Sequence, residues 1–153
     1  MATTTSILSQ HTLAVLYRNE KSIDNLKLQK VMFLSLCEYL ETHGCDLPLK
    51  YTEPFVAWRH GAVIPSDYHY YKKYGAAYII MNGKYHETLS CLDSYILKFA
   101  RYSTWELVYY NKKLPFWNKH KERILRKSDY PVYSLEDIKE DSKLLHKVIR
   151  DKV

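Results

Sequence analysis

The residues from Asn25 to His43 constrain the fold more than any other part of the chain. Apolar side chains recur there at helical spacings, namely Leu28, Val31, Met32, Leu36, Tyr39 and Leu40. Phe33 and Leu34 widen this stripe, so a helix formed by the segment would be buried on most of its sides. Gly44 can adopt the left-handed conformation that ends a helix. The chain is therefore predicted to fold around one central helix, with Asn25 as its N-cap.

Apolar periodicity and capping patterns predict further helices. They cover residues 6–18, 65–75, 91–100, 104–110, 118–127 and 135–149. Three of them begin at a serine that precedes a carboxylate by three residues, at Ser90, Ser103 and Ser134. Asn82-Gly83 is the preferred pair for a two-residue turn between strands. The sequence thus predicts a mainly α (α+β) fold: a single compact helical domain, residues 1–153, of about six to seven helices with one small antiparallel β-hairpin near residues 77–89.

Composition supports a packed, reduced protein. Hydrophobic residues make up 46% of the 153 residues, which argues against disorder, and only 4 glycines argue against an all-β sandwich. No apolar run approaches the length of a membrane span, and the N-terminus lacks the pattern of a signal peptide. Cys37, Cys45 and Cys91 have no paired spacing. We therefore expect a cytoplasmic protein with no membrane partner.

No pattern of catalytic or metal-binding residues stands out. The chain has 7 histidines, but they do not combine with cysteines at ligand spacing. It lacks a phosphate-binding glycine loop, a dinucleotide fingerprint and a nucleophile elbow. The carboxylate pairs Glu38 with Glu41 and Glu140 with Asp141 are expected to lie on solvated helix faces. We therefore expect a protein that is not an enzyme and that uses no metal or cofactor.

Tyrosine is unusually frequent, with 15 residues, and residues 68–74 interleave aromatic rings with lysines. Tyr68 and Tyr71 should lie on one face of the helix, and Trp58 precedes the turn at Gly61. A tyrosine or tryptophan suits both a protein interface and base stacking. The alternative is that these rings pack in the core. The sequence leaves both interpretations open.

The positive charge is concentrated in residues 112–127. This segment holds seven Lys and Arg residues against Glu122 alone, which equals the net charge of +6 of the whole chain. An anionic partner would meet this region first. Nucleic acid is compatible with it, but no known nucleic-acid-binding motif indicates it. A lysine-rich helix is also often simply solvated.

Two blocks of sequence resemble the SocA-like Panacea domain, a family of bacterial and phage antitoxins. They are residues 26–30, Leu-Lys-Leu-Gln-Lys, and residues 57–65, Ala-Trp-Arg-His-Gly-Ala-Val-Ile-Pro, followed by Tyr68. A late Pro-Trp element and a closing helix complete the resemblance. Ala62 stands where the family usually has proline, Phe116 is inserted into the Pro-Trp element, and Asn111-Lys112 replaces a frequent Thr-His pair.

The resemblance implies an antitoxin that binds and neutralises a partner toxin protein without catalysis, or delivers it to a protease. Its partners would be a cognate toxin and, in the second case, a cellular protease. A phage or other mobile element is a typical source. We expect the toxin to contact a surface near the turn at Gly61, made of Trp58, Arg59, His60, Tyr68, Tyr71, Lys72, Lys119 and Arg123. The alternative function is nucleic-acid binding through residues 112–127 and the interleaved tyrosines.

Overall fold

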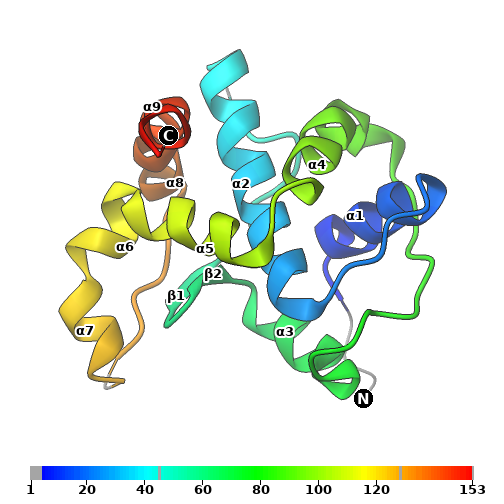
Figure 1. Ribbon diagram of the computed structural model, residues 1–153. Coiled ribbons are helices and arrows are strands. Elements are labelled where there is room, and N and C mark those ends of the chain that lie inside the picture. Colours follow the sequence, from blue (N-terminus) through cyan, green and yellow to red (C-terminus); the bar gives the residue numbers. More distant parts are fainter. Residues whose placement is uncertain (1–4, 45, 128, 153) are drawn as a thin grey trace.

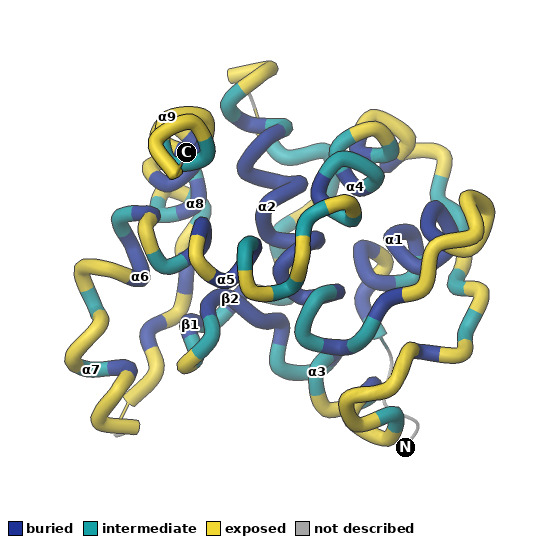
Figure 2. The backbone as a smooth tube through the Cα atoms, viewed as in Figure 1, coloured by how far each residue is buried: buried dark blue, intermediate teal, exposed yellow. Residues whose placement is uncertain are grey.

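The computed structural model describes residues 5–44, 46–127 and 129–152, so Cys45 lies outside the described residues. Helix α2 (Asn25–His43) runs through the middle of the molecule and is buried along most of its length (Figures 1 and 2). Its N-cap is Asp24 rather than Asn25, because the Asp24 carboxylate accepts a hydrogen bond from the Lys27 amide. Gly44 ends it with a φ of 64°. The predicted central helix is thus present.

Four helices pack around α2 and enclose the core. They are α1 (Ile7–Arg18), α4 (Asp93–Ala100), α5 (Thr104–Lys113) and α8 (Leu135–Ser142). At the centre the Phe33 ring lies 5.2 Å from that of Phe55 and 4.9 Å from that of Tyr133. Such tilted and edge-to-face pairs are the favoured packing of aromatic side chains. The core therefore joins α2 to two connecting segments as well as to the helices.

Shorter helices complete the chain. They are α3 (Pro65–Tyr71), α6 (Pro115–Lys119), α7 (Lys121–Leu125), α9 (Leu145–Asp151) and the 3₁₀ helices η1 (Lys72–Tyr74) and η2 (Glu87–Leu92). Pro65 and Pro115 each occupy a first helical turn, where proline is tolerated. Figure 2 shows α7 mostly exposed at one end of the molecule.

The predicted fold class, mainly helical with one small antiparallel hairpin, is confirmed for the described residues. They form nine α-helices rather than six or seven, because two predicted helices are each divided. The basic segment bends at His120, and the closing helix is interrupted between Ser142 and Leu145, where the Ser142 hydroxyl bonds to the Lys139 carbonyl. Capping boxes form at Ser103 and Ser134. The one predicted at Ser90 does not form, since that residue lies within η2.

The β-hairpin lies elsewhere than predicted. Strand β1 (Val56–Trp58) pairs antiparallel with β2 (Gly61–Val63), with Trp58 opposite Gly61. Arg59 and His60 alone connect the two strands. The hairpin therefore occupies a segment in which the sequence indicated only the turn at Gly61.

The predicted hairpin near residues 77–89 is wrong, because its backbone groups pair with α1 and with the segment between α1 and α2 instead of with each other. The Ile79 amide donates to the Ile23 carbonyl at 2.9 Å, and the Lys84 amide donates to the Gln10 carbonyl at 3.0 Å. At Gly83, a Cβ atom would fall 2.7 Å from the Ala14 nitrogen. The glycine is thus explained by close approach to α1 and not by a strand turn.

Candidate partner-binding surface

The turn between β1 and β2 is held from beneath by buried polar side chains. The Ala62 amide donates to Asn111 Oδ1 at 2.8 Å, and the Ala62 carbonyl accepts from Lys30 Nζ at 2.5 Å. A Cβ atom at Gly61, whose φ is 108°, would lie 2.8 Å from Asn111 Cγ and 2.9 Å from Lys30 Cε. Glycine is therefore required for both its conformation and its lack of a side chain. The turn is fixed to α2 and α5.

A second chain of hydrogen bonds fixes the start of α3. The Ile64 amide donates to Gln29 Oε1 at 2.9 Å, and Gln29 Nε2 donates to Asn25 Oδ1 at 3.2 Å. Asn25 Nδ2 in turn donates to the Tyr68 carbonyl at 3.0 Å. Asn25, Gln29 and Lys30 lie in or beside the Leu-Lys-Leu-Gln-Lys block of the sequence. These polar residues of α2 therefore position the segment from Ala62 to Tyr68.

Aromatic rings gather where the hairpin meets α3. The ring of Trp58 lies 5.1 Å from that of Tyr68, 5.9 Å from that of His69 and 6.3 Å from that of Tyr130. Trp58 and Tyr68 are partly exposed and Tyr130 is exposed. From below, Trp117 Nε1 donates to the Trp58 carbonyl at 2.9 Å. The structure thus brings the predicted residues Trp58 and Tyr68 together.

The sequence prediction omitted Trp105, which is 62% exposed in the first turn of α5. Its ring lies 5.2 Å from that of His60. Trp105, Tyr68 and Lys72 also line a hollow of about 370 Å³, together with Asp24 and Thr104. The only signal in the sequence was a tryptophan two residues after the capping Ser103. We call Trp58, Arg59, His60, Tyr68, His69, Trp105 and Lys112 the hairpin surface.

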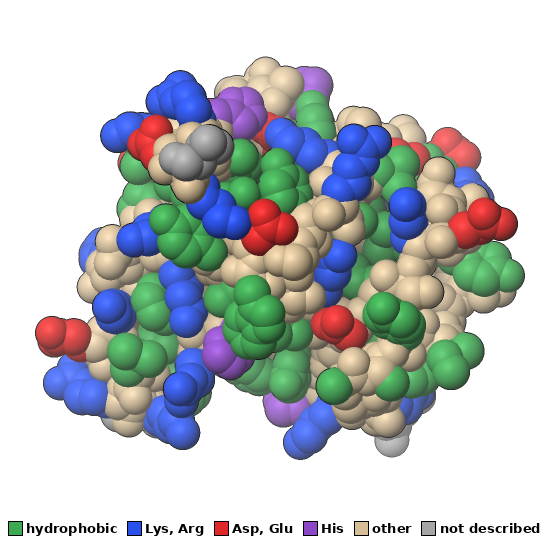
Figure 3. All heavy atoms as spheres, viewed as in Figure 1, with side chains coloured by type: hydrophobic (Ala, Val, Ile, Leu, Met, Phe, Trp, Pro, Cys, Tyr) green, Lys and Arg blue, Asp and Glu red, His purple; other side chains and the backbone are tan. Residues whose placement is uncertain are grey.

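Positive charge surrounds this surface. Lys112 Nζ lies 4.8 Å from the ring centroid of the buried Trp117. Burial lowers the pKa of Lys112, and the neighbouring cations Arg59 and Lys121 lower it further. Burial likewise lowers the pKa of His60, with further contributions from Lys112, Arg59 and Lys30. In Figure 3, Lys and Arg side chains gather over α6 and α7, beside the green and purple side chains near β1 and β2.

The other predicted site residues have different positions. Tyr71 is fully buried and its hydroxyl lies 3.0 Å from Ser9 Oγ, so it cannot belong to a partner-binding surface. Its partner in the predicted pair, Tyr68, is the one that faces outward. Lys72 is exposed at the edge of the hollow. Lys119 is exposed at the end of α6, and Arg123 pairs with Asp129 at 2.5 Å.

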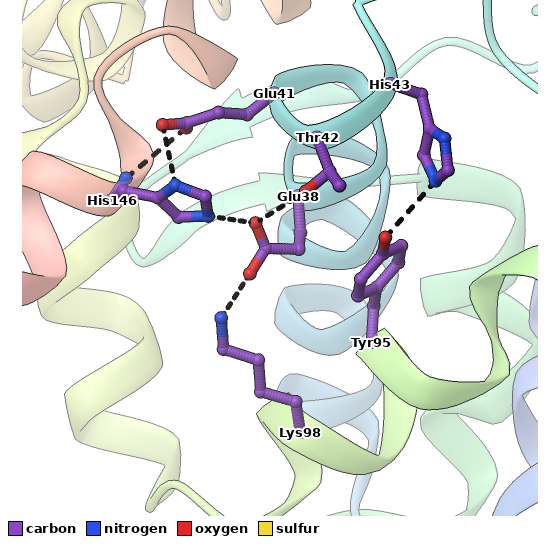
Figure 4. A network of polar contacts seen from close by, with 7 residues as sticks. All are labelled: Glu38, Glu41, Thr42, His43, Tyr95, Lys98 and His146. Carbon is purple, nitrogen blue, oxygen red and sulfur yellow. Dashed lines mark hydrogen bonds and ion pairs between the residues drawn. The ribbon is translucent and has the colours of Figure 1, made fainter.

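A second polar cluster joins α2, α4 and α9 (Figure 4). Glu38 is 3% exposed and accepts from Lys98 and His146, while His146 Nδ1 lies 3.0 Å from Glu41. Burial raises the pKa of Glu38, but the hydrogen bonds from Lys98 and His146 outweigh it and leave the pKa lowered. The prediction of a solvated helix face is therefore wrong for Glu38, and it is also wrong for Asp141, which is fully buried. Within the described ranges no group of His, Cys, Asp and Glu has the arrangement of a metal site.

Comparison of the chain with protein-family models, with curated proteins and with solved structures returned no match. None of the helices in the described part of the chain combines the length and apolar character needed to cross a membrane.

Proposed function

We propose that this chain is an antitoxin-like protein that binds a partner toxin through the hairpin surface and neutralises it without catalysis. The observation that supports the proposal best is that Trp58, Tyr68 and Trp105, all at least partly exposed, lie around a turn that Lys30 and Asn111 fix to α2 and α5. Tryptophan and tyrosine dominate the energetics of protein interfaces. A turn that is already ordered also loses little conformational entropy on binding.

The resemblance to the Panacea domain supports the same proposal from the sequence. Its two characteristic blocks meet in space, because Gln29 and Lys30 of the first block bond to Ile64 and Ala62 of the second. Ala62, which replaces the usual proline, uses an amide hydrogen that proline lacks. The departure from the family pattern is therefore accompanied by a compensating contact to Asn111.

Co-expression with the product of the neighbouring open reading frame tests the proposal. Wild type should relieve the growth arrest caused by that product and bind it directly. Trp105→Ala should lose relief and weaken binding by tenfold or more, while its melting temperature stays unchanged. Tyr17→Ala is the matched control, since Tyr17 is 59% exposed on α1. Absence of relief and of binding by wild type would count against the function, and full relief by Trp105→Ala would count against this surface.

Two mechanisms remain open under this proposal, and the level of the toxin separates them. Occlusion of a toxin's substrate site should leave its steady-state amount unchanged. Delivery to a cellular protease should lower that amount, and deletion of the protease should restore it. Immunoblots of the co-expressing cells measure both.

The second candidate function is nucleic-acid binding. It is favoured by the exposed cations of α6, α7 and the residues that follow, which include Lys119, Lys121, Arg126 and Lys127. Phosphate contacts release counterions, so such binding should weaken steeply as the salt concentration rises. A titration with a DNA duplex at 50 and 200 mM salt distinguishes it from an interface of aromatic side chains.

A further inference from the structure

The cations of the hairpin surface have no acidic partner in the described ranges of the chain. Among the residues that the structure describes, neither Arg59 nor Lys112 forms an ion pair with a carboxylate. Within the described part of the chain, the buried Lys30 beneath them has only the Ala62 carbonyl as its hydrogen-bond acceptor. Like charges held together without compensation are unfavourable unless a ligand supplies the opposite charge.

One atom of this cluster is also unsatisfied. His60 Nδ1 is buried and has no hydrogen-bond partner among the described residues. A buried polar atom without a partner calls for an explanation, such as a ligand that bonds to it in the complex. His60 follows the exposed Arg59 in the chain and its ring contacts that of Trp105, so its environment is both cationic and aromatic.

We propose that Arg59, His60 and Lys112 form an anion-binding site that receives carboxylate side chains from an acidic segment of the partner protein. This inference rests on the proposed function, since it specifies the chemistry of the partner. Arg59 comes from the hairpin turn and Lys112 from α5. The two cations thus lie on two different elements, as suits separate carboxylates. Trp105 and Tyr68 would contact apolar side chains next to those carboxylates.

The arrangement of the rings favours a protein over a nucleic acid. Base stacking needs aromatic faces that are free. Trp58 is already in contact with three other rings, and the face of Trp117 is covered by Lys112. Of the tryptophans, only Trp105 is largely exposed. The hairpin surface is therefore a poor stacking platform.

Peptide and oligonucleotide binding test the site directly. The probes are a fluorescein-labelled ten-residue peptide of alternating Glu and Leu and a labelled ten-nucleotide oligothymidine, each titrated at 50 mM salt. The peptide should bind wild type, and the double variant Arg59→Gln/Lys112→Gln should bind it at least tenfold more weakly. Lys84→Gln/Lys147→Gln has the same net charge and changes exposed lysines outside the cluster, so it should stay within twofold of wild type.

Three outcomes would overturn the inference. The first is that wild type does not bind the peptide. The second is an equal loss of peptide affinity in both double variants, which would indicate that net charge alone is responsible. The third is that wild type binds the oligonucleotide more tightly than the peptide and that only Arg59→Gln/Lys112→Gln weakens this binding. The co-expression assay separates this inference from the proposed function. If growth relief persists in Arg59→Gln/Lys112→Gln, the anion-binding site is contradicted and the proposed function stands. If wild type binds the peptide but gives no growth relief, the proposed function is contradicted and the site stands.

Discussion

The amino group of Lys30 lies 2.5 Å from the carbonyl oxygen of Ala62, and the whole Lys30 side chain is buried. Burial lowers the pKa of Lys30 to about 7, with a smaller contribution from Lys112. A lysine in the unfolded chain keeps its proton until about pH 10.4. The folded protein therefore binds fewer protons than the unfolded chain between these values, and below pH 7 it bears the full cost of burying the charge.

Lys30→Met should remove this pH dependence. In wild type, the contribution of Lys30 makes the free energy of unfolding rise between pH 7 and pH 9, by up to about 1.4 kcal/mol per pH unit. The difference between wild type and Lys30→Met should follow that slope. Urea denaturation at pH 7, 8 and 9 measures it, and a constant difference would show that Lys30 does not titrate in this range. Lys84→Met is the control at an exposed position.

Asp141→Asn should stabilise the protein at alkaline pH. Burial raises the pKa of Asp141 to about 7, although the Phe116 amide donates to Oδ1 at 3.0 Å. Its Oδ2 is buried and has no hydrogen-bond partner among the described residues. Because the folded pKa exceeds the unfolded one, the charged carboxylate destabilises the fold fully above pH 7, and this cost disappears as the pH falls toward 4.

For Asp141→Asn we expect the free energy of unfolding to increase by on the order of 1–3 kcal/mol at pH 8, and this increase should shrink toward zero near pH 4. Asparagine keeps an oxygen that can accept from Phe116. Chemical denaturation across this pH range is the measurement. Glu140→Gln, at an exposed position on the same helix, should change stability by less than about 0.5 kcal/mol. A loss of stability in Asp141→Asn at pH 8 would contradict the account.

Gly61→Ala should be far more damaging than Gly75→Ala. Both glycines have a positive φ, 108° and 59° respectively, but a Cβ at Gly75 would meet nothing within 4 Å. At Gly61 it would collide with Asn111 and Lys30. We expect the free energy of unfolding to fall by about 1 kcal/mol in Gly75→Ala and by more than about 3 kcal/mol in Gly61→Ala. Thermal unfolding of the two variants measures the difference, and equal melting temperatures would show that the turn is not closely packed.

Glu38→Ala should loosen the attachment of α4 and α9 to α2. Removal of the buried carboxylate leaves Lys98 and His146 without their shared partner. Lys98 and His146 are themselves partly exposed, so water can replace the lost contact and the cost should be about 1–3 kcal/mol. Glu140→Ala serves as the exposed counterpart. Melting temperatures within 1 °C of each other would show that the cluster contributes little to stability.

Local patterns were enough to predict much of the helical frame. The bounds of α1 and α2 and the starts of α5 and α8 follow from capping residues and apolar spacing, which act within a few neighbouring positions. The hairpin could not be recognised in this way. Its strands are only three residues each, too short for a pattern of alternation, and its turn depends on Lys30 and Asn111, which are distant in sequence.

The candidate site was predictable only in part for the same reason. Trp58 and Tyr68 were identified because they flank the turn, and the structure joins their rings. Tyr71 shares the helical spacing of Tyr68, yet its hydroxyl reaches Ser9 of α1 in the core. Trp105 could not be identified from the sequence, because its contact with His60 depends on how α5 packs beside the hairpin. Spacing specifies which side chains share a face but not which face another helix covers.

Because the Ala62 and Ile64 amides donate to the side chains of Asn111 and Gln29, their hydrogens are shielded by groups that only global unfolding should displace. The Ala62 and Ile64 amide hydrogens should therefore exchange for deuterium as slowly as those at the centre of α2, although they lie beside an exposed surface. A ligand that docks on the turn would leave these two amides at the exchange limit set by overall stability. Their exchange rates provide an internal reference for the faster exchange rates of amides in neighbouring exposed residues.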